Sequence, residues 1–194
     1  MKVLGIYGSP RAEGNSDLLL DRVLEGARSG GAAIDRLYLR DIVFSPCTEC
    51  GGCDETGRCI IDDAMQGVYR RLLESEIVFL ASPVFFYGLT AQAKAMVDRC
   101  QALWRRRMLT KSREERKRFD GGAGFLVMTA AAEGLKVYEC GELTAKYFFY
   151  SLDKSYGGGF FARAENKGEI LEKPGELERA FRFGKAAVRQ MSRQ

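Results

Sequence analysis

The stretch KVLGIYGSPRAEGNSDLLLDRVLEGA, residues 2–27, decides the fold because three different patterns follow one another in it. Residues 2–7 form a short, mostly apolar run of the kind found in buried strands. Residues 8–16 (GSPRAEGNS) are rich in turn-forming and polar side chains. Residues 17–27 then repeat apolar side chains at helical spacing. The stretch therefore predicts a strand, a loop and a helix in that order.

The same order of strand and helix returns along the rest of the chain. The patterns predict further strands at residues 33–39, 76–81, 121–128 and 158–164, and further helices at 65–75, 90–104, 138–152 and 175–191. Asp62 and Asp63 can cap the helix that begins after them. Because parallel strands need crossover helices, this alternation predicts an α/β fold with a parallel sheet covered on both faces. We expect one domain over residues 1–194, with a cysteine-rich loop at 46–60.

Composition narrows the class of protein. The 194 residues include no histidine, which excludes a Ser-His-Asp nucleophile system, an HExxH zinc site and the usual neutral-pH proton shuttle. A formal net charge of +4 does not by itself argue for a nucleic-acid partner. The first residues lack the pattern of a signal sequence, and no apolar run is long enough to span a bilayer. We therefore expect a cytoplasmic protein with no membrane contact.

The loop GSPRAEGNS suits an anion because it lies between a strand and the start of a helix. Its glycines let the backbone approach a ligand, and helix N–H groups point at the same place. Ser9, Asn15 and Ser16 supply neutral donors and Arg11 a charged one. The pattern is neither GxGxxG nor GxxxxGK[ST], which counts against a dinucleotide-binding Rossmann domain and a P-loop NTPase. Alternatively, the segment only turns the chain and caps the helix.

The loop GSPRAEGNS, the stretch SPVFFYGLTAQAKAMVDR and the five strand–helix repeats together resemble the NADPH-dependent FMN reductase family of flavodoxin-like flavoproteins. The resemblance covers nearly the whole chain and implies a three-layer flavodoxin-like fold, a five-stranded parallel sheet with strand order 2-1-3-4-5. It implies that the phosphate of FMN is held by Ser9, Arg11, Asn15 and Ser16. It also implies that the ribityl chain and isoalloxazine ring are bordered by Pro83, Val84, Phe85, Phe86, Tyr87 and Gly88.

The aromatic residues Phe85, Phe86 and Tyr87 offer flat apolar faces for a tricyclic ring, although core aromatics in a turn are an alternative. In the family a third loop, which starts here at Thr129, approaches the other side of the ring. Alanines at positions 130–132 stand where relatives often have glycine, which limits close approach of the backbone. No acid or base is assigned, because hydride transfer to flavin needs alignment more than a proton donor.

Four cysteines share one short loop with the spacing C-x2-C-x2-C-x5-C: Cys47, Cys50, Cys53 and Cys59. Three interpretations stay open, namely a 4Fe-4S cluster, a structural zinc site and an unmetallated loop. Zinc usually pairs two cysteine knuckles across a longer separation, so the compact run suits it poorly. Within the family, this arrangement followed by two aspartates resembles the iron–sulfur flavoproteins, which carry FMN and a 4Fe-4S cluster on one chain.

The surroundings of these cysteines add three expectations. Gly51 and Gly52 ease the curl that gathers the first three sulfurs, and Gly57 lets the chain return with the fourth. Because the loop follows a strand, we expect it to leave the sheet at the same carboxyl edge as the phosphate loop. The two other cysteines, Cys100 and Cys140, fall on predicted helices and are expected in the core.

The basic stretch at residues 104–118 is interpreted as a solvated helix end and loop. The alternative is a landing site for the extra phosphate of NADPH or for an acidic electron-transfer partner.

These interpretations predict an FMN-dependent oxidoreductase. Its electrons come from NAD(P)H or a reduced ferredoxin-like donor and go to a small-molecule or protein acceptor, through the 4Fe-4S cluster if the loop is loaded. The resemblance implies a homodimer or homotetramer. The alternative is a non-catalytic flavodoxin-type electron carrier, or a redox-sensing FMN-binding protein.

Overall fold

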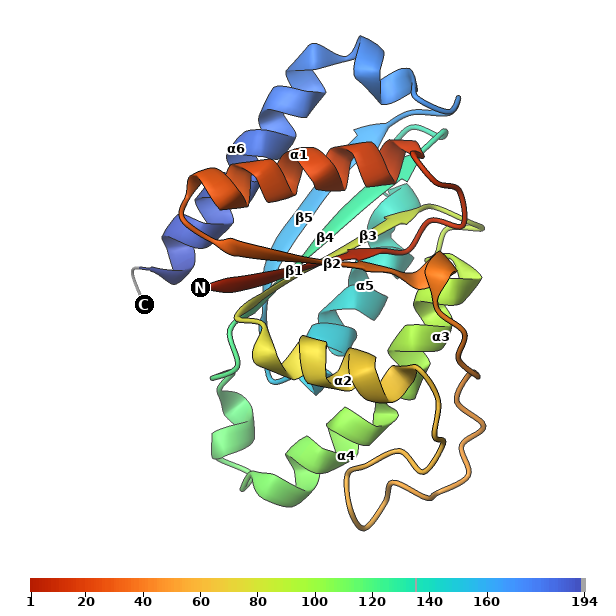
Figure 1. Cartoon of the computed structure of the whole chain (residues 1–194), viewed down its shortest axis with the longest axis vertical. Helices are drawn as coiled ribbons and strands as arrows, with labels where there is room; N and C mark the ends of the chain where they lie inside the picture. The colour runs from red at the N-terminus through yellow and green to blue at the C-terminus, as the bar shows by residue number, and fades with distance from the viewer. Residues whose placement is uncertain (135, 193–194) are drawn as a thin grey trace.

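The computed structural model describes residues 1–134 and 136–192, which form a parallel β-sheet between two layers of helices (Figure 1). The strands are β1 (Lys2–Tyr7), β2 (Ala33–Tyr38), β3 (Ile77–Pro83), β4 (Ala123–Ala130) and β5 (Ser155–Arg163). The α-helices are α1 (Asn15–Ser29), α2 (Met65–Glu74), α3 (Ala91–Arg99), α4 (Gln101–Thr110), α5 (Lys136–Ser151) and α6 (Pro174–Met191). Short 3-10 helices are η1 (Leu39–Asp41), η2 (Glu115–Lys117) and η3 (Glu169–Glu172). The sheet order is β2-β1-β3-β4-β5, with parallel neighbours throughout, so the predicted fold class and strand order are confirmed.

Alternate residues of the central strands enter two separate hydrophobic cores. Leu4 and Ile6 of β1 face the core under α2, α3, α4 and α5, whereas Val3 and Tyr7 face the core under α1 and α6. All four side chains are fully buried. A strand buried on both faces carries apolar residues at every position, which explains why these strands read as continuous runs. Figure 1 shows α1 and α6 on one side of the sheet and the other α-helices on the opposite side.

Helices α1 and α6 cross with their backbones in direct contact. A Cβ atom at Gly184 of α6 would lie 1.8 Å from the carbonyl oxygen of Val23 in α1. A Cβ at Gly26 of α1 would likewise lie 1.9 Å from the carbonyl oxygen of Phe181 in α6. Real Cβ atoms do not come this close, so the crossing needs glycine on both helices.

Most boundaries lie within two residues of expectation, and the larger differences are the division of one helix, the start of β5 and the burial of one cysteine. The helix predicted at 90–104 is divided at Cys100 into α3 and α4. The hydroxyl of Tyr69 donates to the carbonyl oxygen of Arg99 at 2.9 Å, and this bond competes with the backbone hydrogen bond that the same oxygen would accept in a continuous helix. Strand β5 begins three residues earlier than expected. Cys100 is buried as predicted, whereas the prediction for Cys140 is wrong: α5 turns Val137 and its helical neighbours to the core and leaves Cys140 exposed. Within the described ranges, no helix combines the length and apolar character of a membrane span.

Candidate functional site

The carboxyl ends of β1, β3, β4 and β5 surround a cavity of about 240 Å³. Parallel α/β sheets commonly bind ligands at this edge. The predicted flavin residues that the structure brings to the cavity are Ser9, Arg11, Asn15, Ser16, Pro83, Val84, Phe85 and Thr129. The remaining three, Phe86, Tyr87 and Gly88, do not line it.

The phosphate loop forms one wall of this cavity. Ser9 is locked in a local turn, since its hydroxyl donates to the carbonyl of Arg11 at 2.9 Å and accepts from the N–H of Arg11 at 3.1 Å. Asn15 and Ser16 open α1, where backbone N–H groups have no partner inside the helix. The hydroxyl of Ser16 is fully buried and has no hydrogen-bond partner among the described residues. An unpaired buried hydroxyl is costly, so these residues fit an anionic group such as the phosphate of FMN.

Asn15 also ties the phosphate loop to the other end of the chain. Its side-chain amide donates to the carbonyl oxygen of Asn166 at 2.8 Å, and its side-chain oxygen accepts from the N–H of Ile170 at 3.3 Å. Asn15 therefore fixes the segment after β5, of which Glu165 and Lys167 line the cavity. The sequence analysis missed this wall, although the carboxyl end of the fifth strand was a signal for it.

Glu169 shapes the same segment from its far end. Its carboxylate accepts from the N–H groups of Glu165 and Asn166 at 2.8 and 3.0 Å, and pairs with Lys173 at 2.6 Å. These contacts, the Lys173 ammonium first, lower the pKa of Glu169 to about 2. The segment at 164–169 is thus held by a carboxylate that is ionised near neutral pH.

Asp17 is a buried carboxylate in the first turn of α1. It pairs with Arg40 at 2.8 Å through one oxygen, while the other oxygen has no partner among the described residues. Burial raises the pKa of Asp17 to about 6 although Arg40 opposes the shift. Near neutral pH the first turn of α1, directly after the phosphate loop, therefore contains a carboxylate that is close to its titration range.

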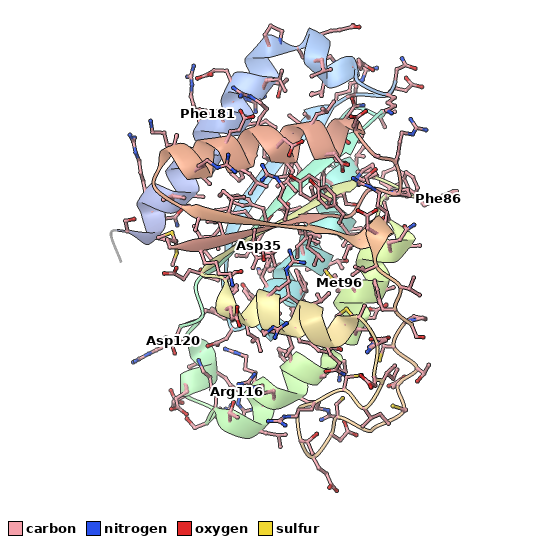
Figure 2. The ribbon with its side chains drawn as sticks, viewed as in Figure 1. Asp35, Phe86, Met96, Arg116, Asp120 and Phe181 are labelled. Atoms are coloured by element: carbon pink, nitrogen blue, oxygen red, sulfur yellow. The ribbon has the colours of Figure 1, made fainter. Side chains whose placement is uncertain are left out.

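An exposed aromatic turn borders the cavity. Phe85 and Gly88 exchange backbone hydrogen bonds of 3.0 and 2.9 Å, and between them Phe86 and Tyr87 adopt positive φ angles of 48° and 62°. This left-handed conformation costs roughly 1–2 kcal/mol for each non-glycine residue. The side chain of Phe86 is fully exposed and lies at the edge of the molecule (Figure 2). The structure thus separates Phe85, which lines the cavity, from two strained aromatic residues that face solvent.

The four cysteines Cys47, Cys50, Cys53 and Cys59 line a second cavity, of about 210 Å³, and none forms a disulfide. The chain reaches it from the carboxyl end of β2 through η1 and runs down to α4 before it returns to α2 (Figure 1). Gly51 and Gly57 have φ angles of 72° and 65°, which L side chains rarely adopt. A Cβ at Gly57 would also lie 2.5 Å from the Cα atom of Arg106, so the returning chain passes directly against α4.

The four thiols can be compared with the requirements of a single zinc ion and of a 4Fe-4S cluster. Within residues 1–134 and 136–192, no three His, Cys, Asp or Glu side chains are close enough to share one metal ion. A tetrahedral zinc site requires such a group, whereas each thiolate of a 4Fe-4S cluster binds its own iron at a corner of a cube. Burial, together with the charges of Asp54, Cys59 and Cys47, raises the pKa of the Cys53 thiol. The four cysteines line one cavity, and four cysteine thiolates are the donor set of a 4Fe-4S cluster.

Helix α3 runs from the phosphate loop to the cysteine cavity. The residue before its first turn, Thr90, caps the helix and donates its hydroxyl hydrogen to the carbonyl oxygen of Gly8 in the phosphate loop. The last residue of α3, Arg99, lines the cysteine cavity. A nine-residue helix spans about 14 Å, so the phosphate loop and the cysteine cavity lie at opposite ends of one short helix.

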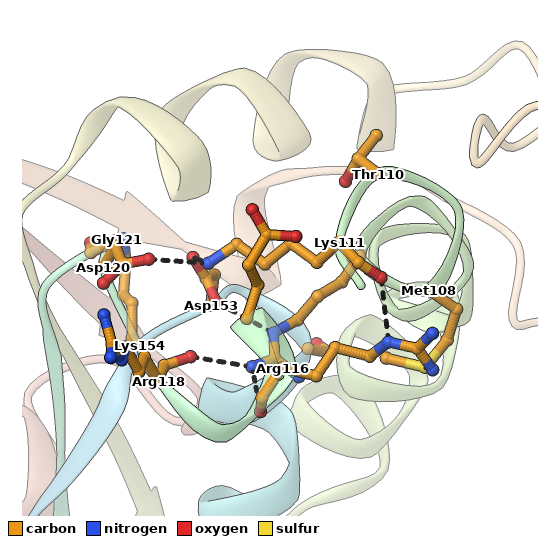
Figure 3. Close-up of polar contacts among 12 residues, drawn as sticks. Met108, Thr110, Lys111, Arg116, Arg118, Asp120, Gly121, Asp153 and Lys154 are labelled. Atoms are coloured by element: carbon orange, nitrogen blue, oxygen red, sulfur yellow. Dashed lines mark hydrogen bonds and ion pairs between the residues drawn. The ribbon is translucent and has the colours of Figure 1, made fainter. Parts of the chain in front are cut away.

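The basic stretch is less solvated than the sequence indicates (Figure 3). Arg107 is buried: it pairs with Asp153 at 2.8 Å and donates to the carbonyl oxygens of Arg116 and Arg118 at 2.8 and 2.9 Å. Lys111 pairs with the same Asp153 carboxylate. The interpretation as a solvated surface is therefore wrong for Arg107, which anchors the segment between α4 and β4.

The sheet order, with a cavity at the carboxyl edge of the sheet, is that of the flavodoxin-like fold. The chain belongs to the NADPH-dependent FMN reductase family, whose model matches residues 1–138. The chain is 39% identical over 103 residues to an iron-sulfur flavoprotein of Methanocaldococcus jannaschii, a match that covers 53% of each protein. The chain spans about half the length of the curated relatives it matches.

Solved structures resemble this fold over nearly its full length. An NAD(P)H:quinone oxidoreductase from Methanothermobacter marburgensis superimposes with a TM-score of 0.69 at 15% identity, covering 95% of this chain and 94% of that one. A flavodoxin from the domain Archaea gives a TM-score of 0.59 at 12% identity, covering 99% of each chain. At these identities the likeness supports the fold alone.

Proposed function

We propose that residues 1–194 form one FMN-binding unit that transfers electrons from NAD(P)H or a reduced ferredoxin-like donor to a small-molecule or protein acceptor. The observation that carries this proposal is the fully buried hydroxyl of Ser16, which has no partner in the described part of the chain and lies beside the N–H groups at the start of α1. Ser9, Arg11, Asn15 and Ser16 would hold the phosphate. Pro83 to Phe85 and Thr129 would border the ribityl chain and the ring, and the exposed residues Phe86, Tyr87 and Gly88 would complete that border.

We further propose that Cys47, Cys50, Cys53 and Cys59 hold a 4Fe-4S cluster. Their shared cavity and the names of the curated relatives support this assignment. When bound, FMN exchanges electrons in pairs or singly and a cluster exchanges them one at a time, so the two together would join two-electron to one-electron chemistry. The chain itself supplies position: α3 fixes the cysteine cavity relative to the phosphate loop.

A homodimer or homotetramer is part of the proposal. Phe86 and Tyr87 expose large apolar faces in a strained turn beside the cavity, and strain of this kind persists only where something over-determines it. Burial of this turn against a second copy would supply that support and would complete the ring pocket.

The test is purification under anaerobic conditions, followed by an absorption spectrum and assays of flavin, iron and sulfide per chain. One FMN and about four irons per chain would support both cofactor assignments. FMN without iron would contradict the cluster, and a chain that binds no FMN would contradict the phosphate site. Steady-state oxidation of NADH or NADPH with a quinone or ferric acceptor then separates an enzyme from a flavodoxin-type carrier, which would show no turnover without a separate reductase.

A further inference from the structure

Arg99 is a buried cation at the wall of the cysteine cavity. Its side chain has no exposed surface, although arginine is rarely buried completely unless paired. It enters from the last turn of α3, far along the chain from the cysteines that share its cavity. A fully buried guanidinium needs an acceptor for each donor, so its contacts indicate its role.

Those contacts join the two ends of the cysteine loop. One nitrogen of the guanidinium, Nη1, donates to the carbonyl oxygen of Ser45 and to the carboxylate of Asp63, both at 2.7 Å. The other, Nη2, donates to Asp63 at 3.1 Å and to the carbonyl oxygen of Ile61 at 3.4 Å. The N–H of Ser45 donates to the same carboxylate at 3.0 Å. Residues 46–60 therefore form a loop whose two ends are held together by one arginine. We call this junction of Ser45, Ile61, Asp63 and Arg99 the neck of the loop.

The contacts of the neck hold in place a loop that contains no helix or strand of its own. Between η1 and α2 the chain forms only turns, with backbone bonds such as Gly57 N–H to Cys53 O at 2.9 Å. A segment of this kind holds four sulfurs around one volume only if its ends are fixed, because an open loop of this length has many conformations. A bidentate arginine–carboxylate pair with two additional carbonyl acceptors is a strong constraint of the required geometry.

The fifth donor of Arg99 is left over. Its Nε–H is buried and has no acceptor among the described residues. A buried donor without a partner costs about 1–3 kcal/mol, and more when it is charged. Arg99 lines the cysteine cavity, and thiolate and sulfide sulfurs both accept hydrogen bonds, so a sulfur-rich group in that cavity would satisfy the donor.

We infer that Arg99 is the positioning residue of the cysteine site: it closes the loop through Ser45, Ile61 and Asp63, and its Nε–H donates to a sulfur of the group bound there. The second half of this inference rests on the proposed cluster, whereas the first half does not. Hydrogen bonds to the sulfurs raise the reduction potential of iron–sulfur clusters. Arg99 therefore both retains the cluster and makes it easier to reduce.

The test compares Arg99→Lys with Arg71→Lys. Arg71 offers a matched control, since it also forms a bidentate pair, with Asp35 at 2.7 and 2.9 Å, and donates to one backbone carbonyl, but it lines neither cavity. Lysine keeps the charge of Arg99 but cannot reach both loop ends or supply Nε–H. We expect Arg99→Lys to keep its flavin and to lose iron to a chelator about 10–100 times faster than wild type. The cluster that remains should have a more negative reduction potential, which a purely structural role would not produce.

Iron release and potential that match those of Arg71→Lys would overturn the inference. If wild type binds flavin but no iron, the proposed cluster fails, and alkylation of the four thiols decides the loop-closing role: faster alkylation in Arg99→Lys than in Arg71→Lys supports it, and equal rates refute it. If Arg99→Lys does not fold, as judged by flavin content and circular dichroism, Asp63→Asn weakens the same neck from the loop side. The same iron-release and alkylation criteria then apply to that variant.

Discussion

Replacement of Gly184 by alanine tests whether the α1–α6 crossing positions the phosphate loop. The added Cβ would lie 1.8 Å from the carbonyl oxygen of Val23, so the helices must separate locally by more than about 1 Å. Overpacking against backbone costs about 3 kcal/mol, at the upper end of its usual range. Alanine recovers roughly 0.5–1 kcal/mol of helix stability, which leaves a net loss of about 2 kcal/mol. For a chain of this length that loss lowers Tm by about 4–8 °C.

The matched control is Gly67→Ala in α2, where an added Cβ meets no atom within 4 Å. It gains the same helix propensity without the clash and should be slightly more stable than wild type. Urea unfolding of the FMN-free proteins measures both free energies. Because α1 carries the phosphate loop at its start, Gly184→Ala should also bind FMN about tenfold more weakly, whereas Gly67→Ala should not. A Gly184→Ala protein with wild-type stability would refute the close crossing.

Each of the two helices places a glycine against the backbone of the other, so a double variant gives a stricter test. If separation of the helices makes room for both methyl groups, the Gly26→Ala/Gly184→Ala double variant should lose less stability than the two single variants together. Additive losses would mean that each glycine is accommodated independently.

Three further predictions concern the first turn of α1 and the aromatic turn beside the cavity at the carboxyl edge of the sheet. Because the pKa of Asp17 in the folded protein, about 6, lies above its ordinary value of 3.8, Asp17 contributes stability that is complete below about pH 4 and that falls by up to about 3 kcal/mol as the pH rises through 6. Asp17→Asn should lack this dependence, and a wild-type-minus-variant difference that stays constant in urea unfolding between about pH 4 and 7 would rule it out. Ser16→Ala should weaken FMN binding about tenfold in a fluorescence titration, because it removes a hydrogen bond to a charged group, whereas Ser29→Ala at the far end of α1 should bind as wild type does. Phe86→Gly should raise the unfolding free energy of the monomer by about 1 kcal/mol through relief of the positive φ angle, and a loss of stability would show that the aromatic ring is packed in the assembled protein.

The sheet could be predicted from sequence because its strands are buried on both faces and read as apolar runs. Strand β5 was harder, since the glycines at positions 157–159 look like a turn. In the structure the ring of Phe125 covers Gly157, where a Cβ would lie 2.3 Å from a ring carbon. Packing against a side chain of the neighbouring strand β4 therefore stabilises this part of β5, and the local sequence pattern does not show such a contact.

Much of the candidate site could be predicted because loops after parallel strands meet at one edge. What escaped prediction depends on contacts between distant residues. The division between α3 and α4 comes from the Tyr69 hydroxyl, and the wall with Lys167 is held by Asn15 from the first loop. Arg99 lies in an ordinary amphipathic helix pattern, so nothing in its local sequence marks it as a residue of the cysteine cavity.

The flavin cavity is closed by residues from opposite ends of the chain. Asn15 meets Asn166 and Ile170 across 151 and 155 positions, whereas Arg99 meets Ser45 and Asp63 across only 54 and 36. A chain leaves the ribosome with its N-terminus first, so the phosphate loop and α1 are synthesised well before Asn166 and Ile170, the residues that Asn15 contacts. The neck of the cysteine loop is complete as soon as α3 has emerged. During synthesis the contacts that close the cysteine loop can therefore form well before the segment after β5 meets the phosphate loop, so the two proposed cofactor sites would be completed in a fixed order.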